Sequence, residues 1–296
     1  MQRTITFFAP SNGKMRDILR NRFSARFCTF LKGEEGRIVC DGTSATGRTL
    51  VTKGQEITVR FSEEVHPPKT VCPLPLSVLY EDEDLIAVHK PRGVASLSTF
   101  GYENSNVISA LFARNPNYNY HVVTRLDKDT EGVVLVAKSG VVHSLLQSLG
   151  GELKKIYLAR GEGVISKPFT VDAPIARGSD VTRVISLAGQ RAITRFAPIS
   201  IMEKDSHPPC TLVAALPVTG RTHQIRLHLA YAGHAAVGDT LYGRGVGAYN
   251  SGQNLACYLL CFPHPVTGER VQIVANGLSF MQKETLPAAE QLLTLF

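Results

Sequence analysis

A cluster of charged residues separates two apolar runs near the middle of the chain. In "HVVTRLDKDTEGVVLVAKS", residues 121–139, three carboxylates follow Arg125: Asp127, Asp129 and Glu131. A neighbouring guanidinium lowers the pKa of a carboxyl group, so such an aspartate stays ionised. An ionised, oriented aspartate can act as a nucleophile or stabilise positive charge in a transition state. The charge pattern by itself is equally typical of a solvated hairpin tip.

Strand geometry distinguishes the three carboxylates from one another. If "HVVTRL" is a strand, Arg125 and Asp127 share one face, because side chains alternate along a strand. Asp127 then projects beside its own arginine. Residues 129–131 are expected to form a solvated turn, and Gly132 can take a positive φ before the next strand. We therefore single out Asp127 as the projecting carboxylate.

The elements that must position this loop are mostly strands. Downstream of residue 76, many short apolar runs alternate with few helical segments, which are expected around 106–114, 140–149 and 222–232, the last capped by Thr222 and closed by Gly233. Strands do not alternate regularly with helices. The pattern predicts an α+β fold with a mixed, mostly antiparallel sheet.

A smaller unit precedes this one. Apolar residues recur at helical spacing from Met15 to Phe23, while three arginines fall largely on the other side: Arg16, Arg20 and Arg26. "GRIVCDG" and "QEITVRF" are expected to be short strands. A proline-rich stretch then indicates a linker. The predicted organisation is a small α/β domain at 1–64, a linker at 65–76 and a larger domain at 77–296.

Composition narrows the class of protein. Residues 1–60 hold eleven Lys and Arg against five Asp and Glu, a charge of +6 out of the total of +7, which favours an anionic partner. Six scattered cysteines, no apolar run long enough for a membrane span and no secretory signal favour a reducing, cytoplasmic location without membrane attachment. A monomer is expected.

Four sequence blocks resemble, in order, the motifs of the RluA-type RNA pseudouridine synthases. They are "VLYEDEDLIAVHKPRGVASLST", "TRLDKDTEGVVLVAKS", "KKIYLARGEG" and "PVTGRTHQIRLHLAYAGHAAVGDTLYG", and they span residues 78–243. The resemblance implies the pseudouridine synthase fold for the larger domain. The chain departs from the common pattern at Thr124, where His is usual, and at Glu131, where Ser is usual.

The first domain is similar to the S4-type RNA-binding domain that precedes the catalytic domain in many of these enzymes. "LRNRFSARF", "GRIVCDG" and "LVTKGQEITV" support the similarity. Asp41 stands where Asn is usual, and Gln55 where Asp is usual. The similarity implies that this domain binds the RNA backbone, with Arg16, Arg20 and Arg26 as its contacts.

The resemblance also implies roles for individual residues. Asp127 would attack a uridine flipped out of the RNA, Tyr157 would stack on its base and could take the C5 proton, and Arg226 would pair with Asp127. The RNA contacts it implies are Arg125, Lys90, Arg221 and His223. The reaction breaks the N1–C1′ bond and forms a C5–C1′ bond, so it requires no redox change and no cofactor.

Ribosomal RNA is favoured over transfer RNA as the partner, because of the S4-like domain. One alternative is a non-catalytic RNA-binding or ribosome-assembly factor on the same scaffold. Another, an aspartate-dependent glycosidase, would need a second carboxylate that the four blocks do not supply. A metal site is not expected, because the spacing of His223, His228 and His234 prevents all three from sharing one helical face.

Overall fold

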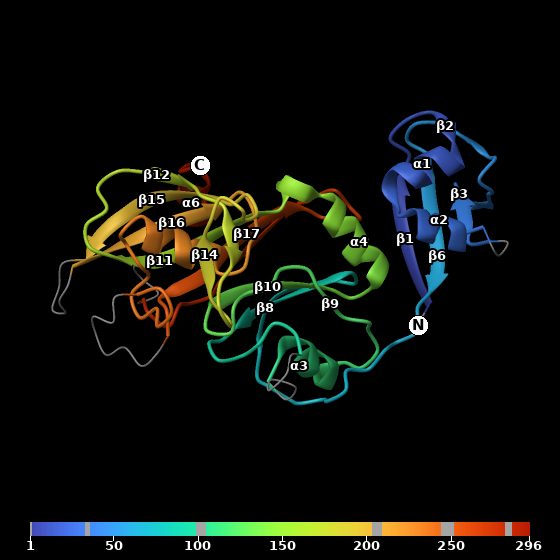
Figure 1. The fold of residues 1–296 in the computed structure, drawn as a ribbon. Coiled ribbons are helices and arrows are strands. Elements are labelled where there is room, and N and C mark those ends of the chain that lie inside the picture. Colours follow the sequence, from blue (N-terminus) through green and yellow to red (C-terminus); the bar gives the residue numbers. More distant parts are fainter. Residues whose placement is uncertain (1, 33–35, 99–104, 203–208, 244–251, 282–285) are drawn as a thin grey trace.

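The computed structural model places the beginning of the chain in a small unit of its own (Figure 1). The structure describes residues 2–32, 36–98, 105–202, 209–243, 252–281 and 286–296. Four strands pair antiparallel in the order β1-β6-β3-β4, and β2 pairs with β5. The bounds are Gln2–Phe8 for β1, Gly13–Lys14 for β2, Ile38–Cys40 for β3, Thr43–Ser44 for β4, Leu50–Val51 for β5 and Glu56–Ser62 for β6.

Alternating side chains explain how this sheet forms a core. In β6, Ile57, Val59 and Phe61 are buried, and the residues between them are less so. One buried face per strand is typical of an antiparallel sheet covered on one side. The core includes residues of the two helices, such as Leu19 and Phe27, and the Phe27 ring lies 5.1 Å from the ring of Phe61. These helices are α1, Met15–Arg22, and α2, Ala25–Phe30.

The larger unit is built on one ten-stranded sheet. Eight strands follow the order β12-β15-β16-β11-β17-β10-β8-β7, with β18 paired to β17 and β9 paired to β10. The expected α+β fold with a mixed, mostly antiparallel sheet is confirmed. The bounds are Ser77–Glu81 for β7, Leu85–Lys90 for β8, His121–Val122 for β9, Glu131–Ala137 for β10, Lys154–Glu162 for β11, Phe169–Asp172 for β12, Ile193–Met202 for β15, Cys210–Pro217 for β16, Leu255–Pro263 for β17 and Arg270–Val274 for β18.

A parallel contact lies in the middle of this sheet. Among the described strand pairs only β10 with β17 is parallel, with Gly132 opposite Cys257. Every residue of β10 is buried. At Gly132 φ is +112°, and an added Cβ would lie 2.1 Å from the carbonyl oxygen of Cys257. Glycine is therefore required for the two strands to approach so closely.

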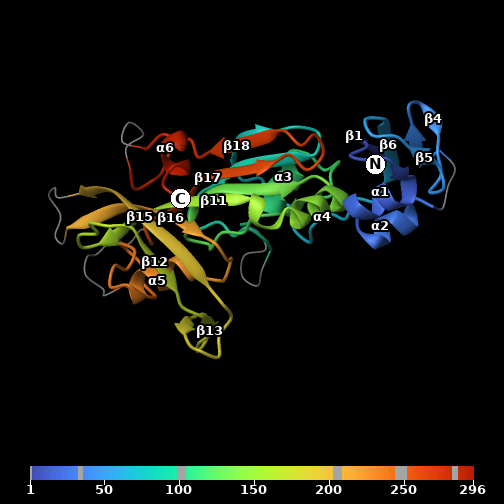
Figure 2. The same cartoon turned by 90° about the horizontal axis from the view of Figure 1, so that it is seen from above.

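Four α-helices accompany the large sheet, and a separate hairpin projects from it. The helices are α3, Val107–Arg114, α4, Gly140–Ser148, α5, Gln224–Tyr231, and α6, Ala289–Leu293. The Asn106 side chain caps α3 and the Ser139 side chain caps α4, each by accepting a backbone N–H. The hairpin of β13, Ile175–Arg177, and β14, Arg183–Ile185, extends away from the sheet in Figure 2.

Three helices lie where the sequence predicts them, and three details differ. Gly233, with φ +87°, follows α5 as expected, but Thr222 is not its cap, because the cap position is His223 in a left-handed conformation. The strand expected over 121–126 ends at Val122, and the chain continues without regular structure to residue 130. Strand β1 was not expected, although its alternating "QRTITFF" is typical of a strand.

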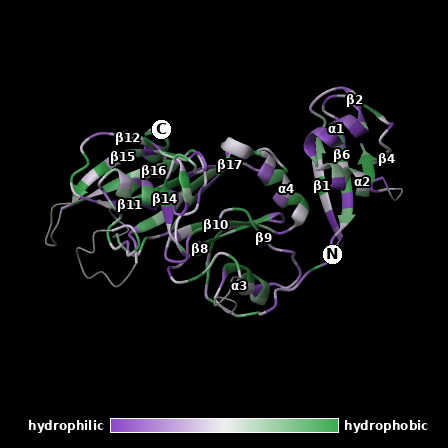
Figure 3. Cartoon of the chain, in the orientation of Figure 1, coloured by the Kyte–Doolittle hydropathy of each residue, from purple (hydrophilic) through white to green (hydrophobic). Residues whose placement is uncertain are grey.

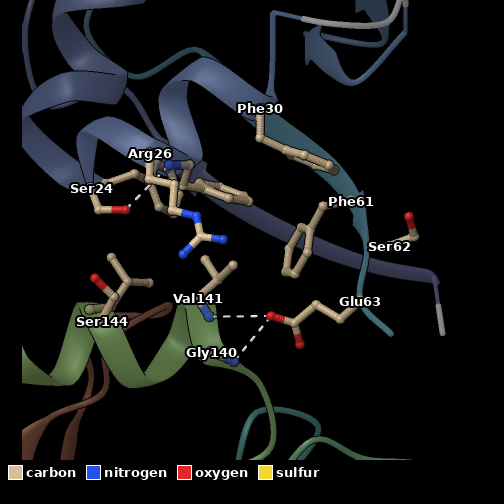
Figure 4. Close-up of a pocket in the computed structure, with 12 residues that line it drawn as sticks. Ser24, Arg26, Phe30, Phe61, Ser62, Glu63, Gly140, Val141 and Ser144 are labelled. Atoms are coloured by element: carbon tan, nitrogen blue, oxygen red, sulfur yellow. Dashed lines mark hydrogen bonds between the residues drawn. The ribbon is translucent and has the colours of Figure 1, made fainter. Parts of the chain in front are cut away.

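The two units meet at α4. Residues 63–76 between them contain no helix or strand. The Glu63 carboxylate accepts hydrogen bonds from the backbone N–H groups of Gly140, at 3.0 Å, and Val141, at 3.4 Å (Figure 4). An anion at a helix N-terminus is electrostatically favoured. Two more contacts join the units: Arg3 with the Asp84 carboxylate at 2.7 Å, and Arg22 with the Pro265 carbonyl at 2.9 Å.

Candidate active site

A cleft of about 1050 Å³ opens between the loop that follows β9, strand β11 and the start of α5. Strand β10 is buried along its length and mainly hydrophobic (Figure 3), so it gives the loop before it a rigid base. Six of the residues singled out from the sequence line this cleft: Arg125, Asp127, Tyr157, Arg221, His223 and Arg226.

Asp127 faces a buried arginine in this cleft. Arg226 Nη1 donates to Asp127 Oδ2 at 3.4 Å, and 27% of the Asp127 side chain is exposed. The other side of the guanidinium binds Asp239, with Nε to Oδ2 at 2.7 Å and Nη2 to Oδ1 at 2.8 Å. The fork therefore has a fixed direction, and its remaining nitrogen points at Asp127. Burial by itself lowers the pKa of Arg226, but Asp239 and Asp127 together raise it, so the guanidinium is always charged.

Tyr157 reaches the cleft through an irregularity in the sheet. The register between β11 and β17 shifts between Ile156 and Tyr157, and bulges of this kind redirect side chains next to active sites. Tyr157 is 9% exposed and lines the same cleft as Asp127. Burial raises the pKa of Tyr157 well above its usual range, and Cys257 and Asp127 add to that effect. The hydroxyl is therefore neutral near pH 7, and the aromatic ring is available for stacking.

Comparisons with known proteins indicate the family to which the chain belongs. A family model described as RNA pseudouridylate synthase matches residues 84–231. An uncharacterised RNA pseudouridine synthase of Bacillus subtilis, YjbO, is 35% identical over 85% of this chain and 90% of its own length. Ribosomal large subunit pseudouridine synthase D of Vibrio cholerae is 32% identical over 86% of this chain and 84% of its own.

The chain belongs to the RluA-type RNA pseudouridine synthases. It is thus an enzyme of the isomerase class that acts on RNA. Human RNA Pseudouridylate Synthase Domain Containing 1 has a similar fold, with a TM-score of 0.58 and 24% identity over 75% of this chain and 94% of that one.

Lys90 is not available as the RNA contact that the resemblance implies. The side chain is fully buried, and Nζ donates to the carbonyl oxygens of Pro91, Val94 and Lys128, at 2.9, 2.7 and 2.8 Å. The last of these bonds ties the Lys-Pro turn to the residue after Asp127. A cation enclosed in this way fixes the loop that carries Asp127, and it does not line the cleft.

The expected solvated turn after Asp127 is also buried in part. Thr130 and Glu131 are 2% and 4% exposed. The Glu131 carboxylate accepts hydrogen bonds from the backbone and hydroxyl of Ser279, and lies 3.5 Å from Arg92 Nε. The expectation of a solvated tip is wrong here, because these groups bind a distant segment of the chain that the local pattern does not include. Burial opposes ionisation of Glu131, but its partners outweigh burial and lower its pKa.

The other expected RNA contacts divide into two sets. Arg125 and Arg221 are exposed at the cleft, and Arg221 Nε donates to the Arg191 carbonyl at 3.1 Å. His223 lies deeper, with 13% of its side chain exposed. The arginines of the first unit lie away from the cleft, exposed on α1 and α2: Arg16, Arg20 and Arg26.

Two residues of the site were not singled out from the sequence, Asp239 and Tyr242. Both lie in "GDTLYG", which the resemblance covers, but a carboxylate thirteen residues beyond Arg226 has no local pattern that marks it as a partner. Two of the three histidines that were compared for a metal site form hydrogen bonds instead, His228 with Thr194 and His234 with the Glu162 carbonyl. Within the described ranges, no three His, Cys, Asp or Glu residues are arranged to hold a metal ion, and no helix is long and apolar enough to cross a membrane.

Proposed function

We propose that this protein converts uridine in RNA to pseudouridine, with Asp127 as the nucleophile toward a flipped-out nucleotide. The observation that supports it most is the ion pair of Arg226 with Asp127, inside a cleft that Tyr157 also lines. Asp127 attacks the sugar as the N1–C1′ bond breaks. The freed uracil then turns so that C5 displaces Asp127 from C1′, which restores the carboxylate, and the proton that C5 loses is balanced by the one that N1 gains.

The surrounding residues fit the needs of this reaction. Positive charge develops at the sugar when the glycosidic bond breaks, and a fixed carboxylate stabilises it. Base flipping costs a few kcal/mol, which stacking on Tyr157 and contacts from Arg125 and Arg221 offset. Because the Tyr157 hydroxyl is neutral, we assign the ring to stacking on the base and the hydroxyl to hydrogen bonding. We do not propose that Tyr157 removes the C5 proton as a phenolate.

We propose ribosomal RNA as the substrate. Relatives from Vibrio cholerae and Pseudomonas aeruginosa carry the name ribosomal large subunit pseudouridine synthase D. We also propose that the first unit is an S4-like domain that binds the RNA backbone. In support, the Gln55 side-chain amide donates to the Asp41 carboxylate at 2.8 Å. The two departures from the S4 pattern thus compensate for each other, because the amide and the carboxylate have exchanged positions.

Asp127→Asn tests the nucleophile. The variant keeps the size of the side chain, so folding and RNA binding should persist while pseudouridine formation falls by about 10³-fold or more. The readout is release of tritium from C5-labelled uridine in ribosomal RNA. Asp129→Asn is the matched control, since it removes a carboxylate two residues away. Full activity of Asp127→Asn would refute the assignment.

The substrate is tested in cells. Pseudouridine maps of total RNA, made with and without the gene, should differ at one or a few uridines of large-subunit ribosomal RNA. A plasmid copy of the wild type should restore those positions, and a copy of Asp127→Asn should not. A difference confined to transfer RNA would overturn the proposed substrate and leave the reaction itself in place.

A further inference from the structure

His223 has an unusual backbone conformation at the start of α5. Its φ is +57° and its ψ is +15°, and its side chain makes no capping bond. The left-handed region is unfavourable for a residue with a Cβ. Strain of this kind persists where the surroundings fix it, and it is concentrated at functional sites.

The conformation places the imidazole ring between Tyr242 and the nucleophile. Nδ1 lies 2.9 Å from the Tyr242 hydroxyl, and Nε2 lies 3.9 Å from Asp127 Oδ2. The hydroxyl also accepts the backbone N–H of Arg183 at 2.8 Å. Arg183 begins β14, so one hydroxyl group connects the projecting hairpin with the ring beside Asp127.

These bonds favour one position for the hydrogen of the neutral ring. A phenol has one proton to donate. The Tyr242 oxygen already accepts the backbone N–H of Arg183, and among the described contacts Nδ1 is the acceptor for the phenol proton. This arrangement favours the tautomer with its hydrogen on Nε2, the nitrogen that faces Asp127.

Burial keeps the ring in this neutral form. It lowers the pKa of His223, and four charged groups act on the ring: Asp127 and Asp239 favour the proton, and Arg226 and Arg183 oppose it. A neutral ring with its hydrogen on Nε2 cannot accept a proton at that nitrogen, so it is not a base toward the uridine. It offers a single N–H to the carboxylate.

We propose that His223 is a positioning residue that supplies Asp127 with a second hydrogen-bond donor, beside Arg226, once bound RNA closes the 3.9 Å separation. The inference rests on the proposed role of Asp127. Two donors from different directions fix the carboxylate plane, which one arginine nitrogen at 3.4 Å leaves free to rotate. Tyr242 holds the ring in the required tautomer.

Kinetics test the role in catalysis. Asn tolerates the left-handed conformation but is too short to reach the carboxylate, so His223→Asn should lower the single-turnover rate at saturating RNA by about 100-fold. The Kd for the same RNA should stay within about 3-fold. A raised Kd with an unchanged rate would overturn the proposal, because it would make His223 an RNA contact.

Tyr242→Phe tests the tautomer and leaves the ring of His223 in place. Without the hydroxyl, Nδ1 can carry the hydrogen of the neutral ring, which removes the Nε2–H donor from part of the molecules, so the single-turnover rate at saturating RNA should fall. Nitrogen NMR of the wild type, with the His223 signals identified by their loss in His223→Asn, should show Nε2 protonated, and Tyr242→Phe should show a mixture. Protonation of Nδ1 in the wild type would refute the inference. This spectrum needs no turnover, so it stands apart from failure of the proposed activity.

Discussion

Asp127, the proposed nucleophile, depends on a residue that does not line the cleft. Asp239 has a fully buried side chain, and its carboxylate fixes the Arg226 fork while it accepts the backbone N–H groups of Leu241 and Tyr242. Burial opposes ionisation of Asp239, but Arg226 outweighs it and lowers the pKa. Removing one partner of a buried ion pair leaves the other charge uncompensated, which costs about 3 to 5 kcal/mol of stability. The pair therefore links the direction of Arg226 to the stability of the fold.

Lys90 gives a pH-dependent prediction. Burial lowers its pKa to about 8, and the attraction of Asp129, Asp127 and Glu131 offsets only part of that effect. An unfolded lysine has a pKa of about 10.4. Between these values the unfolded chain binds more protons than the folded one, so the contribution of Lys90 to stability rises with pH across that window.

The variant Lys90→Met removes this contribution and leaves three carbonyl groups without their donor. It should lower the free energy of unfolding by about 1 to 3 kcal/mol at pH 7, and the difference from the wild type should grow between pH 8 and pH 10. Urea unfolding at several pH values measures it. The exposed Lys167→Met is the control and should show a constant small difference. A difference in the free energy of unfolding that became smaller above pH 8 would contradict the predicted role of Lys90.

At the scale of elements, the parallel contact of β10 with β17 holds the loop of Asp127 close to Tyr157. Tyr157 on β11 pairs with Cys257 of β17, and Gly132 of β10 pairs with the same residue from the other side. Gly132→Ala should prevent this approach, since its Cβ would lie 2.1 Å from a carbonyl oxygen. We expect the variant to melt roughly 6 to 12 °C lower or to be recovered unfolded, because a loss of about 3 kcal/mol shifts Tm by roughly 2 to 4 °C per kcal/mol.

Calorimetry or circular dichroism provides the measurement, with Gly277→Ala as the matched control. An added Cβ at Gly277 meets no atom within 4 Å, and its backbone is not left-handed. Equal Tm values for the two variants would show that β10 and β17 can adjust to the added Cβ.

The sequence predicts what depends on local pattern and misses what depends on distant contacts. Helices α3 to α5 and the mixed sheet follow from periodicity. Asp127 follows from its neighbours in "TRLD": Thr124 and Leu126 are buried, whereas Arg125 is exposed and Asp127 is half-buried, so the expected alternation holds although no strand forms. The burial of Lys90 and Glu131 could not be predicted, because their partners lie up to 148 residues away. No glycine or proline next to Tyr157 in the sequence indicates the bulge there.

At the scale of the whole molecule, the positive charge and the active site lie on different units. The basic helices of the first unit are separated from the cleft by α4, where Glu63 binds the helix N-terminus. Burial raises the pKa of Glu63, and its hydrogen bonds with the backbone N–H groups of Val141 and Gly140 oppose that effect. The orientation of the proposed RNA-binding surface toward the cleft thus depends on contacts between the units, in addition to the linker.

This division predicts that affinity and catalysis can be separated. Arg16, Arg20 and Arg26 are exposed and far from the cleft lining, so replacing all three by Gln should weaken binding of ribosomal RNA. If each contacts one phosphate, the slope of log K against log salt should fall by roughly 2 to 3. The single-turnover rate at saturating RNA should stay within about 2-fold. The control replaces Lys167, Arg195 and Arg270 by Gln, which removes the same charge from the larger unit. Equal loss of salt dependence in both variants would mean that only net charge, and no surface on the first unit, attracts the RNA.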